Sequence, residues 1–175
     1  MRIFIALLFP KLIKDEIYRT LEILKDNYRG NYTTYDNLHL TLHYIGEVSS
    51  EMLKKITDGI MQIEYSKFQI HTANLSSFKN SSKHRLVHVK VDANSQLKLL
   101  HKRVIFALEK AGVEIDNANF SPHITLGRKV EIGFDDLSGF KISELDIPIT
   151  RVSIMESKRV DEELVYEEIA YIKLQ

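Results

Sequence analysis

The chain has 175 residues, 44% of them hydrophobic, which is enough for one compact domain with a substantial core. Its 24 basic and 24 acidic residues balance, and this excludes the strong overall positive charge of proteins that bind nucleic acid across their whole surface. Because cysteine is absent, disulfides, thiolate metal sites and a cysteine nucleophile are excluded as well. We therefore expect a single domain over residues 1–175.

The opening stretch has an apolar run of only seven residues, and charged residues follow it at once. It therefore predicts a buried strand and not a signal peptide. No apolar run approaches the length of a membrane span. We expect a cytoplasmic protein that makes no contact with a membrane.

The hydrophobic pattern predicts strands that alternate with helices along the chain. Alternation or short apolar runs predict strands at residues 2–8, 38–45, 68–74, 85–91, 122–129, 142–157 and 164–174, of which the last two form a closing pair. Apolar residues at helical spacing predict helices at residues 11–27, 50–63 and 95–110. Polar and glycine-containing stretches predict loops at residues 30–34 and 76–83, and residues 131–140 are expected to be irregular.

Two short stretches share a pattern in which a histidine and a threonine lie two residues apart. The first contains His39 and Thr41, and the second contains His123 and Thr125. Residues i and i+2 of a strand project from one face, so each stretch presents these polar residues on one face and its aliphatic residues on the other. Two such strands facing each other would place two imidazoles and two hydroxyls around one small site.

The order of strand, helix, loop and motif strand occurs twice at nearly the same spacing. His39 lies 37 residues after Arg2, which begins the first strand, and His123 lies 38 residues after Arg85, which begins the corresponding strand. The matched spacing predicts an internal repeat, with two interleaved lobes related by an approximate two-fold axis. Each lobe would supply one motif strand to a shared cleft.

The paired motifs suit acid/base chemistry at a phosphate. Histidine has an ordinary pKa of about 6.5, so one neutral and one protonated imidazole can together take a proton from an attacking oxygen and give one to a leaving oxygen. The hydroxyls of Thr41 and Thr125 would donate hydrogen bonds to the phosphoryl oxygens. Arg128 would complete the site, although strict alternation directs it to the opposite face and a bulge, strand twist or strand end would have to turn it inward. This chemistry requires no metal ion.

The two copies differ just after the motif. Gly127 occupies the position equivalent to His43, and Arg128 occupies the position equivalent to Tyr44. Strict alternation places His43 on the face of His39. Because His43 has no counterpart in the second copy, we expect it at the rim of the cleft. The remaining histidines show no paired arrangement and are expected at the surface or half-buried: His71, His84, His88 and His101.

The segment at residues 79–85 is the best local basic patch in the sequence. It contains Lys83 and Arg85 and has Phe78 at its edge, so phosphate contacts and an aromatic platform would suit a single-stranded RNA end. Tyr35, which precedes the first motif, and His43 are further candidates for RNA contact. The alternative interpretation is an ordinary solvated polar loop.

The residues around the two motifs resemble the two signatures of the 2H phosphoesterase superfamily. The matching segments are His39-Leu-Thr-Leu, followed by Ile45-Gly-Glu-Val48, and Pro122-His-Ile-Thr-Leu-Gly-Arg128. The most similar branch is the bacterial and archaeal RNA 2′,3′-cyclic phosphodiesterase, historically called 2′-5′ RNA ligase. The resemblance covers nearly the whole chain and implies a bilobal α+β fold with antiparallel sheets around a central cleft and helices outside.

The same resemblance implies hydrolysis of a 2′,3′-cyclic phosphate at an RNA end to a 2′-phosphomonoester, with 2′-5′ ligation as the reverse chemistry. It matches His39 to the proton donor and His123 to the proton acceptor that activates water. Thr41 and Thr125 match the phosphate-binding hydroxyls, and Arg128 matches a basic residue often found after the second motif. The implied partner is an RNA with a cyclic phosphate end or a cyclic nucleotide, and no cofactor or obligate protein partner is expected.

Two other functions remain open from the sequence. A non-catalytic module of the same fold would bind RNA ends without turnover, although binding alone would not require two titratable groups. A metal site would use His39, His43 and His123 as ligands.

Overall fold

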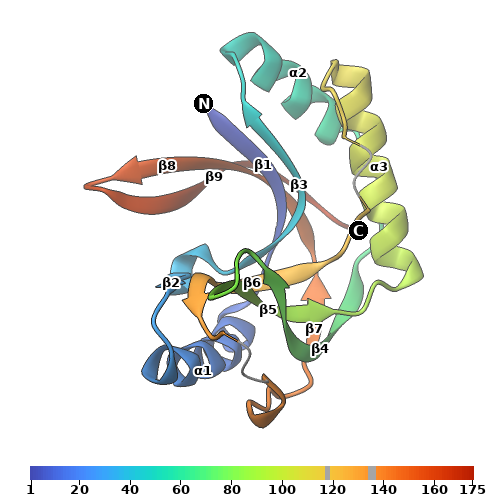
Figure 1. The fold of residues 1–175 in the computed structure, drawn as a ribbon. Coiled ribbons are helices and arrows are strands. Elements are labelled where there is room, and N and C mark those ends of the chain that lie inside the picture. Colours follow the sequence, from blue (N-terminus) through green and yellow to red (C-terminus); the bar gives the residue numbers. More distant parts are fainter. Residues whose placement is uncertain (117–118, 134–136) are drawn as a thin grey trace.

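The computed structural model describes residues 1–116, 119–133 and 137–175, in which nine strands form one sheet and three α-helices pack on it (Figure 1). The strands are β1 (Arg2–Leu8), β2 (Asn31–Tyr32), β3 (His39–Glu47), β4 (Phe68–Lys79), β5 (His84–Val91), β6 (His123–Glu131), β7 (Asp146–Ile149), β8 (Arg151–Val160) and β9 (Glu163–Lys173). The helices are α1 (Lys11–Asn27), α2 (Ser50–Ile60) and α3 (Ser95–Ala111), with short 3-10 helices η1 (Tyr35–Asn37) and η2 (Leu137–Gly139). The predicted α+β class is confirmed.

The order of the strands places the two motif strands at the centre of the sheet. The path runs β7-β4-β5-β6-β3-β1-β8-β9, and β2 pairs with β6 beside it. Strand β1 pairs with β3 in one half, β5 pairs with β6 in the other, and all of these neighbours are antiparallel. The two predicted repeats therefore occupy equivalent places on either side of the contact between β3 and β6, which we call the β3–β6 seam (Figure 1).

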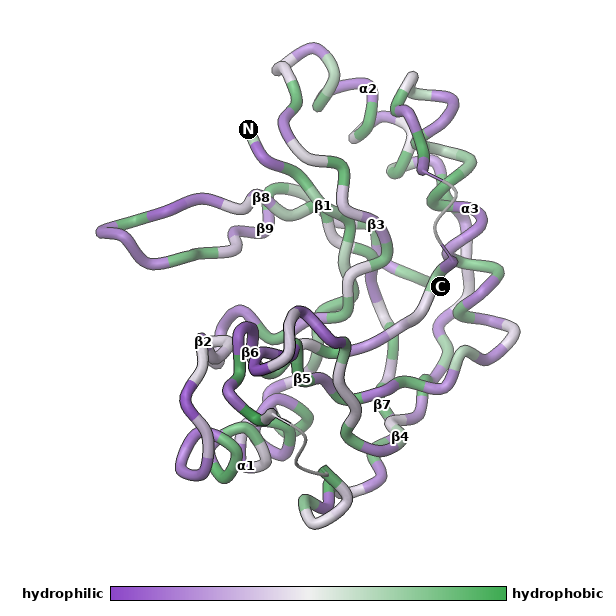
Figure 2. The backbone as a smooth tube through the Cα atoms, in the orientation of Figure 1, coloured by the Kyte–Doolittle hydropathy of each residue, from purple (hydrophilic) through white to green (hydrophobic). Residues whose placement is uncertain are grey.

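The main hydrophobic core lies between the sheet and the helices. On α1, Ile17, Leu21 and Leu24 recur at helical spacing and are all buried. They pack in the same core as Leu40 and Ile124, the aliphatic residues between the histidine and the threonine of each motif. Figure 2 shows the apolar run along β1 and the mixed hydropathy of the helices, which is typical of helices with one face against a core. On the opposite face Phe4, Ala6 and Met155 form a second, smaller apolar cluster, beside which β3 and β6 present their polar motif residues.

The helix boundaries follow ordinary capping chemistry. The Ser49 side chain accepts a hydrogen bond from Met52 N at 3.1 Å, and the Asn94 side chain accepts one from Leu97 N at 2.8 Å, so α2 and α3 begin at capping residues. Helix α3 ends at Gly112, whose φ of 92° is in the left-handed region that favours glycine. None of the helices in the described part of the chain is long and apolar enough to cross a membrane.

The predicted loop at residues 76–83 is wrong over its first half, because β4 continues to Lys79. Ser76 and Ser77 pair with His88 and Val87 of β5, so backbone hydrogen bonding overrides the polar composition. The predicted loop at residues 30–34 contains the short strand β2. Of the stretch expected to be irregular, residues 134–136 lie outside the described residues, and the part that follows includes η2.

The C-terminal region also differs from the prediction of one closing pair. The stretch at residues 142–157 divides into β7, which pairs with β4, and β8, which pairs with β1 at the other side of the sheet. Pro148 lies in β7, which is an edge strand, and this is where a residue without a backbone N–H is tolerated. Strands β8 and β9 do form a hairpin, whose turn at Asp161 and Glu162 has φ angles of 49° and 69°. The hairpin projects beyond the sheet (Figure 1).

Candidate active site

The pairing of β3 with β6 brings the two motifs into contact. Leu40 is the register partner of Ile124. In an antiparallel pair this register sets His39 across from Thr125 and His123 across from Thr41, so the two histidines are diagonal neighbours with Cα atoms about 7–8 Å apart. Both imidazoles lie on the sheet face turned away from the main core, as the alternation in each motif predicts.

A cavity of about 280 Å³ lies on this face at the centre of the sheet. The five residues that the sequence suggested for catalysis and phosphate binding all line it. The complete lining is Phe4, His39, Thr41, Tyr44, His123, Thr125, Arg128, Ser157 and Tyr166. The side chains come from β1, β3, β6, β8 and β9, so the cavity draws on both halves of the sheet.

The two histidines are held by equivalent backbone contacts. Nδ1 of His39 lies 2.6 Å from the carbonyl oxygen of Asn37, and Nδ1 of His123 lies 2.8 Å from the carbonyl oxygen of Ser121. In both cases the acceptor is two residues earlier in the chain. Because a carbonyl can only accept, each Nδ1 carries a proton, and each Nε2 is left for chemistry in the cavity.

His39 has the more enclosed imidazole, and its pKa reflects this. Its ring lies 5.0 Å from the ring of Phe4 and 5.1 Å from that of Tyr166, measured between centroids. Burial lowers the pKa of His39 to about 4, and the positive charges of Arg128 and His123 add to this lowering. In the free protein His39 is therefore neutral at pH 7, and its Nε2 accepts a hydrogen bond from the Thr41 hydroxyl at 2.9 Å.

A bulge in β6 turns Arg128 into the cavity. Val87 pairs with Gly127 whereas His88 pairs with Thr125, so β6 contains one extra residue at this point and the alternation shifts. The sequence required such a feature for Arg128 to reach the site, and the structure contains it. A side chain at Gly127 would force its neighbours to shift, because a Cβ atom there would lie 2.8 Å from Val130 Cγ2.

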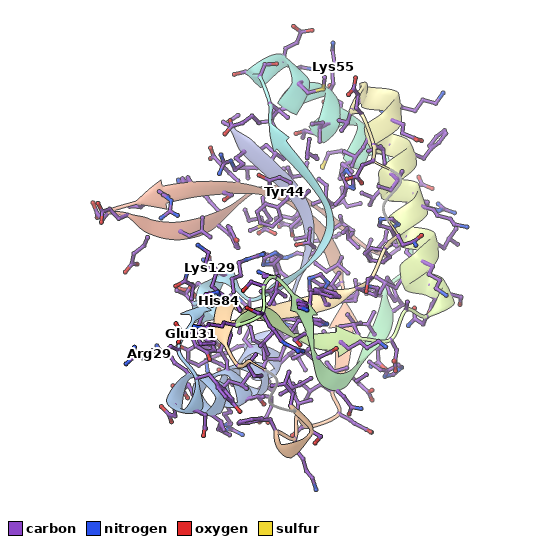
Figure 3. All side chains as sticks on the ribbon, in the orientation of Figure 1. Arg29, Tyr44, Lys55, His84, Lys129 and Glu131 are labelled. Carbon is purple, nitrogen blue, oxygen red and sulfur yellow. The ribbon has the colours of Figure 1, made fainter. Side chains whose placement is uncertain are left out.

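The bulge in β6 has a counterpart in β3, where Ile5 pairs with His43 and Ala6 pairs with Thr41. This shift turns Tyr44 into the cavity at the position equivalent to Arg128. Figure 3 shows Tyr44 on β3 and Lys129 near the bulge of β6. The difference between Tyr44 and Arg128 noted in the sequence therefore lies within the site itself.

A second cavity of about 630 Å³ adjoins the first and shares Thr41, Tyr44 and His123 with it. Two of the predicted RNA contacts, His43 and Phe78, line this second cavity. Phe78 is 41% exposed, which leaves its ring accessible. The lining also includes His101 and Phe120, whose rings stack in parallel with centroids 3.9 Å apart. The second cavity thus offers aromatic surface beside the candidate phosphate site.

Three other predicted RNA contacts are not brought to either cavity. The Tyr35 hydroxyl donates to Asp15 Oδ1 at 2.7 Å, so this side chain ties η1 to α1. Arg85 donates to the carbonyl oxygen of Gly133 and to Ser77 Oγ, both at 3.1 Å. Lys83 lies exposed in the turn between β4 and β5. The structure gives Tyr35 and Arg85 roles in holding the fold.

The sequence did not single out several residues that the structure places at or beside the site. Phe4, Ser157 and Tyr166 line the first cavity but lie on strands without a motif. His88 is 3% exposed, so its expected place at the surface or half-buried is wrong. The sequence offers one signal that His88 is buried, which is its position at the centre of the alternating strand β5. A residue at that position faces one surface of the sheet.

The groove between α2 and α3 and a possible metal cluster are the two alternatives to this site. A groove of about 770 Å³ lies between α2 and α3, and neither motif histidine reaches it. Within the described ranges no three histidine, aspartate or glutamate side chains gather as a metal site would require, so the three-histidine alternative is not formed.

A model of the 2′-5′ RNA ligase superfamily matches residues 13–156, which include both motifs. The chain belongs to this superfamily. The resemblance drawn from the motifs is therefore confirmed. Among its relatives, the RNA 2′,3′-cyclic phosphodiesterase of Archaeoglobus fulgidus is 29% identical over 128 residues, which are 73% of this chain and 72% of that protein. The Bacillus subtilis protein of the same name is 27% identical over 140 residues, covering 78% of this chain and 76% of that protein.

Solved structures of similar proteins share the fold. The crystal structure of TT0787 of Thermus thermophilus has a TM-score of 0.84 at 21% identity and covers 99% of this chain and 98% of that one. Escherichia coli LigT complexed with 3′-AMP has a TM-score of 0.80 at 22% identity and covers 99% of this chain and 97% of that one. The predicted bilobal α+β architecture agrees with these structures over nearly the full length.

Proposed function

We propose that this protein hydrolyses the 2′,3′-cyclic phosphate at an RNA end to a 2′-phosphomonoester, without a metal ion, through acid/base catalysis by His39 and His123. The observation that carries this proposal is the arrangement of the two imidazoles. Both lie on one cavity, and each has its Nδ1 bound to a backbone carbonyl and its Nε2 left for proton transfer. Relatives named RNA 2′,3′-cyclic phosphodiesterase support the same reaction.

In this reaction a water molecule attacks the phosphorus atom opposite the 3′ oxygen. Nε2 of His123 takes a proton from the water as its oxygen bonds to phosphorus, and Nε2 of His39 gives a proton to the 3′ oxygen as that P–O bond breaks. The products are a 2′-phosphate and a free 3′-hydroxyl, and proton exchange with solvent restores the two imidazoles. Thr41 and Thr125 donate hydrogen bonds to the phosphoryl oxygens, and Arg128 offsets the growing negative charge.

The lowered pKa of His39 sets a condition on its role as the acid. A neutral imidazole with its proton on Nδ1 has none on Nε2 to give, so His39 must gain one when substrate binds. The phosphodiester anion supplies the reason, because a negative charge beside the ring favours its protonated form. The Thr41 hydroxyl, which donates to Nε2 of His39 in the free protein, then turns to a phosphoryl oxygen.

The same groups would catalyse 2′-5′ ligation by the same steps with a different nucleophile. The 5′-hydroxyl of a second RNA takes the place of water, and His123 removes its proton as its oxygen bonds to phosphorus. The 3′ oxygen then leaves with the proton of His39. The adjoining cavity, which Phe78 lines, has the aromatic surface that an RNA base stacks on.

The test is product analysis on a short RNA that ends in a 2′,3′-cyclic phosphate. Wild-type protein is expected to yield the 2′-phosphate, and to do so equally in EDTA. His39→Ala and His123→Ala are each expected to lower turnover at least about 100-fold, the size of a general acid or base contribution. Activity that survives both substitutions, or binding of the RNA end with no turnover by the wild type, contradicts the proposal.

A further inference from the structure

A buried histidine packs against His123 from outside the two cavities. His88, on β5, is 3% exposed, and its ring centroid lies 5.0 Å from that of His123 at an interplanar angle of 60°. Phe78, on β4, stacks on His88 with centroids 4.3 Å apart and meets the edge of His123 at 5.2 Å. The three rings form a closed cluster on neighbouring strands, which we call the His123 cluster.

The pseudo-symmetry of the sheet shows that the His123 cluster is an addition to one half only. In that half His88 is the register partner of Thr125, and in the other half Ala6 is the partner of Thr41. The repeat therefore places a buried methyl group where His88 places an imidazole. His39 is surrounded instead by the rings of Phe4 and Tyr166. Each motif histidine thus has two aromatic neighbours, but they come from different strands and have different chemistry.

The two motif histidines also differ in how firmly hydrogen bonds hold them. His39 has contacts at both ring nitrogens, to the Asn37 carbonyl and the Thr41 hydroxyl. For His123 the described residues supply one hydrogen bond, from Nδ1 to the backbone carbonyl of Ser121, which lies just before β6 begins. One contact at Nδ1 leaves the ring free to pivot about it. Packing by His88 and Phe78 is what restricts that motion.

His88 itself is suited to packing and not to proton transfer. Burial lowers its pKa to about 4, and the charges of His123 and Lys90 add to the lowering. The backbone of Leu86 acts against this lowering, although Nδ1 of His88 is buried and makes no hydrogen bond of ordinary geometry to a described residue. Neither cavity is lined by His88, so it does not reach a bound phosphate.

We propose that His88 is a positioning residue for His123, in which a neutral ring supported by Phe78 holds the His123 imidazole with Nδ1 on the Ser121 carbonyl and Nε2 in the cavity. The catalytic consequence rests on the proposed function, whereas the placement of the ring does not. A ring that pivots by even about 1 Å loses alignment with the attacking water, and misplacement of that size lowers rates by about 100-fold.

The test compares His88→Ala with His88→Phe, which keeps a planar ring of similar size. His88→Ala is expected to lower kcat about 10- to 100-fold with KM within about twofold, and His88→Phe is expected to recover most of that loss. His84→Ala is the matched control, because His84 lies on the same strand opposite Glu131 at the exposed end (Figure 3). Unchanged kcat in folded His88→Ala, or an equal loss in His88→Phe, overturns the proposal.

A second measurement reads the position of His123 without activity. Side-chain ¹⁵N NMR is expected to show the Nδ1–H tautomer of His123 in the wild type and in His88→Phe, and a mixture of tautomers in His88→Ala, with and without inorganic phosphate. One tautomer in all three proteins overturns the inference. If the wild type fails to cleave a cyclic phosphate but the tautomers of His123 still differ between the wild type and His88→Ala, the proposed function alone is contradicted. If His88→Ala does not fold, His88→Leu, which keeps apolar volume without a planar ring, takes its place with the same expected results.

Discussion

The backbone carbonyl of Asn37 holds His39 at 2.6 Å while the side chain of the same residue is anchored to β9. Asn37 Nδ2 donates to the carbonyl oxygen of Leu164 at 2.7 Å, and Asn37 Oδ1 accepts from the backbone N–H of Tyr166 at 3.1 Å. One buried residue thus ties a candidate catalytic histidine to the projecting hairpin. The orientation of His39 depends on a strand that is distant in the sequence.

Asn37→Ala is expected to lower both stability and turnover. The substitution leaves the Leu164 carbonyl and the Tyr166 N–H without their partner, which costs about 1–3 kcal/mol of unfolding free energy. It also frees the Asn37 carbonyl to shift, so kcat should fall about tenfold, as expected for loss of a positioning contact of this strength. Urea denaturation and steady-state kinetics on a cyclic-phosphate RNA measure the two effects. Asn80→Ala, in the exposed turn before β5, is the control, and a destabilised Asn37→Ala protein with full kcat contradicts this account.

Stability is expected to fall as the pH is lowered from about 6.5 to about 4. His39 and His88 both have a pKa near 4 in the folded protein and 6.5 as the ordinary value. Between these values the unfolded chain binds more protons than the folded one, so the unfolding free energy is fully present above pH 6.5 and declines through this window. The loss is up to about 3 kcal/mol for each histidine.

Urea denaturation of the wild type and of His88→Phe at pH 7, 5 and 4 measures this effect. The variant lacks one of the two buried imidazoles, so its curve should decline less steeply over the same window. Carboxylates contribute equally to both proteins at low pH and cancel in the difference. Parallel loss of stability in the two proteins contradicts the assignment of a lowered pKa to His88.

Gly127→Ala is expected to destabilise the fold and to reduce activity together. The added methyl group would lie 2.8 Å from Val130 Cγ2 and 3.0 Å from Tyr32 Cδ1, and overpacking of this kind costs about 1–3 kcal/mol. Relief of the clash would move the bulge that turns Arg128 inward. Gly139→Ala is the matched control, because a Cβ atom there has no neighbour within 4 Å. Equal thermal midpoints for the two variants would count against a tight bulge.

Arg128→Gln is expected to lower kcat/KM about 10- to 100-fold. A hydrogen bond to a charged group contributes about 1.5–3 kcal/mol, and the charge on the phosphate is greatest in the transition state. Lys129→Gln removes the neighbouring charge outside the cavity and should change kcat/KM by less than about twofold, as screening of an exposed charge predicts. Similar losses in both variants would indicate a general electrostatic effect and no direct contact by Arg128.

The central features of the fold could be predicted because they depend on local pattern. Alternation in residues 38–45 and 122–129 determines which side chains share a face, and the repeat determines that these two strands are equivalent. The bulge in β6 was one of three features that could turn Arg128 inward, the others being strand twist and a strand end, but it could not be located from alternation because it depends on packing around Gly127. The continuation of β4 through Ser76 and Ser77 was missed because hydrogen bonding to β5 decides it.

Some residues of the site could not be predicted from the sequence because their positions depend on the order of the strands in the sheet. Phe4, Tyr166 and His88 lie on strands whose neighbours are fixed only when the whole sheet assembles. Nothing near Tyr166 in the sequence indicates that β9 will reach His39, because the connection runs through Asn37 and the β8–β9 hairpin. The position of Tyr35, a predicted RNA contact, also depends on assembly, since packing of η1 on α1 engages its hydroxyl with Asp15.

Within the described residues, Leu40 and Ile124 are the single register pair recorded between β3 and β6. The pairs β1–β3 and β5–β6, on either side of the β3–β6 seam, have many more register partners. Hydrogen bonding between strands is therefore sparser at the seam, where the two imidazoles lie. The separation of those imidazoles is therefore set by the angle at which two half-sheets join, and not by either strand alone. His39 and His123, the proposed proton donor and acceptor, therefore lie on different half-sheets, so a change in sheet twist far from the cavity would alter the proposed fit of a phosphate between them.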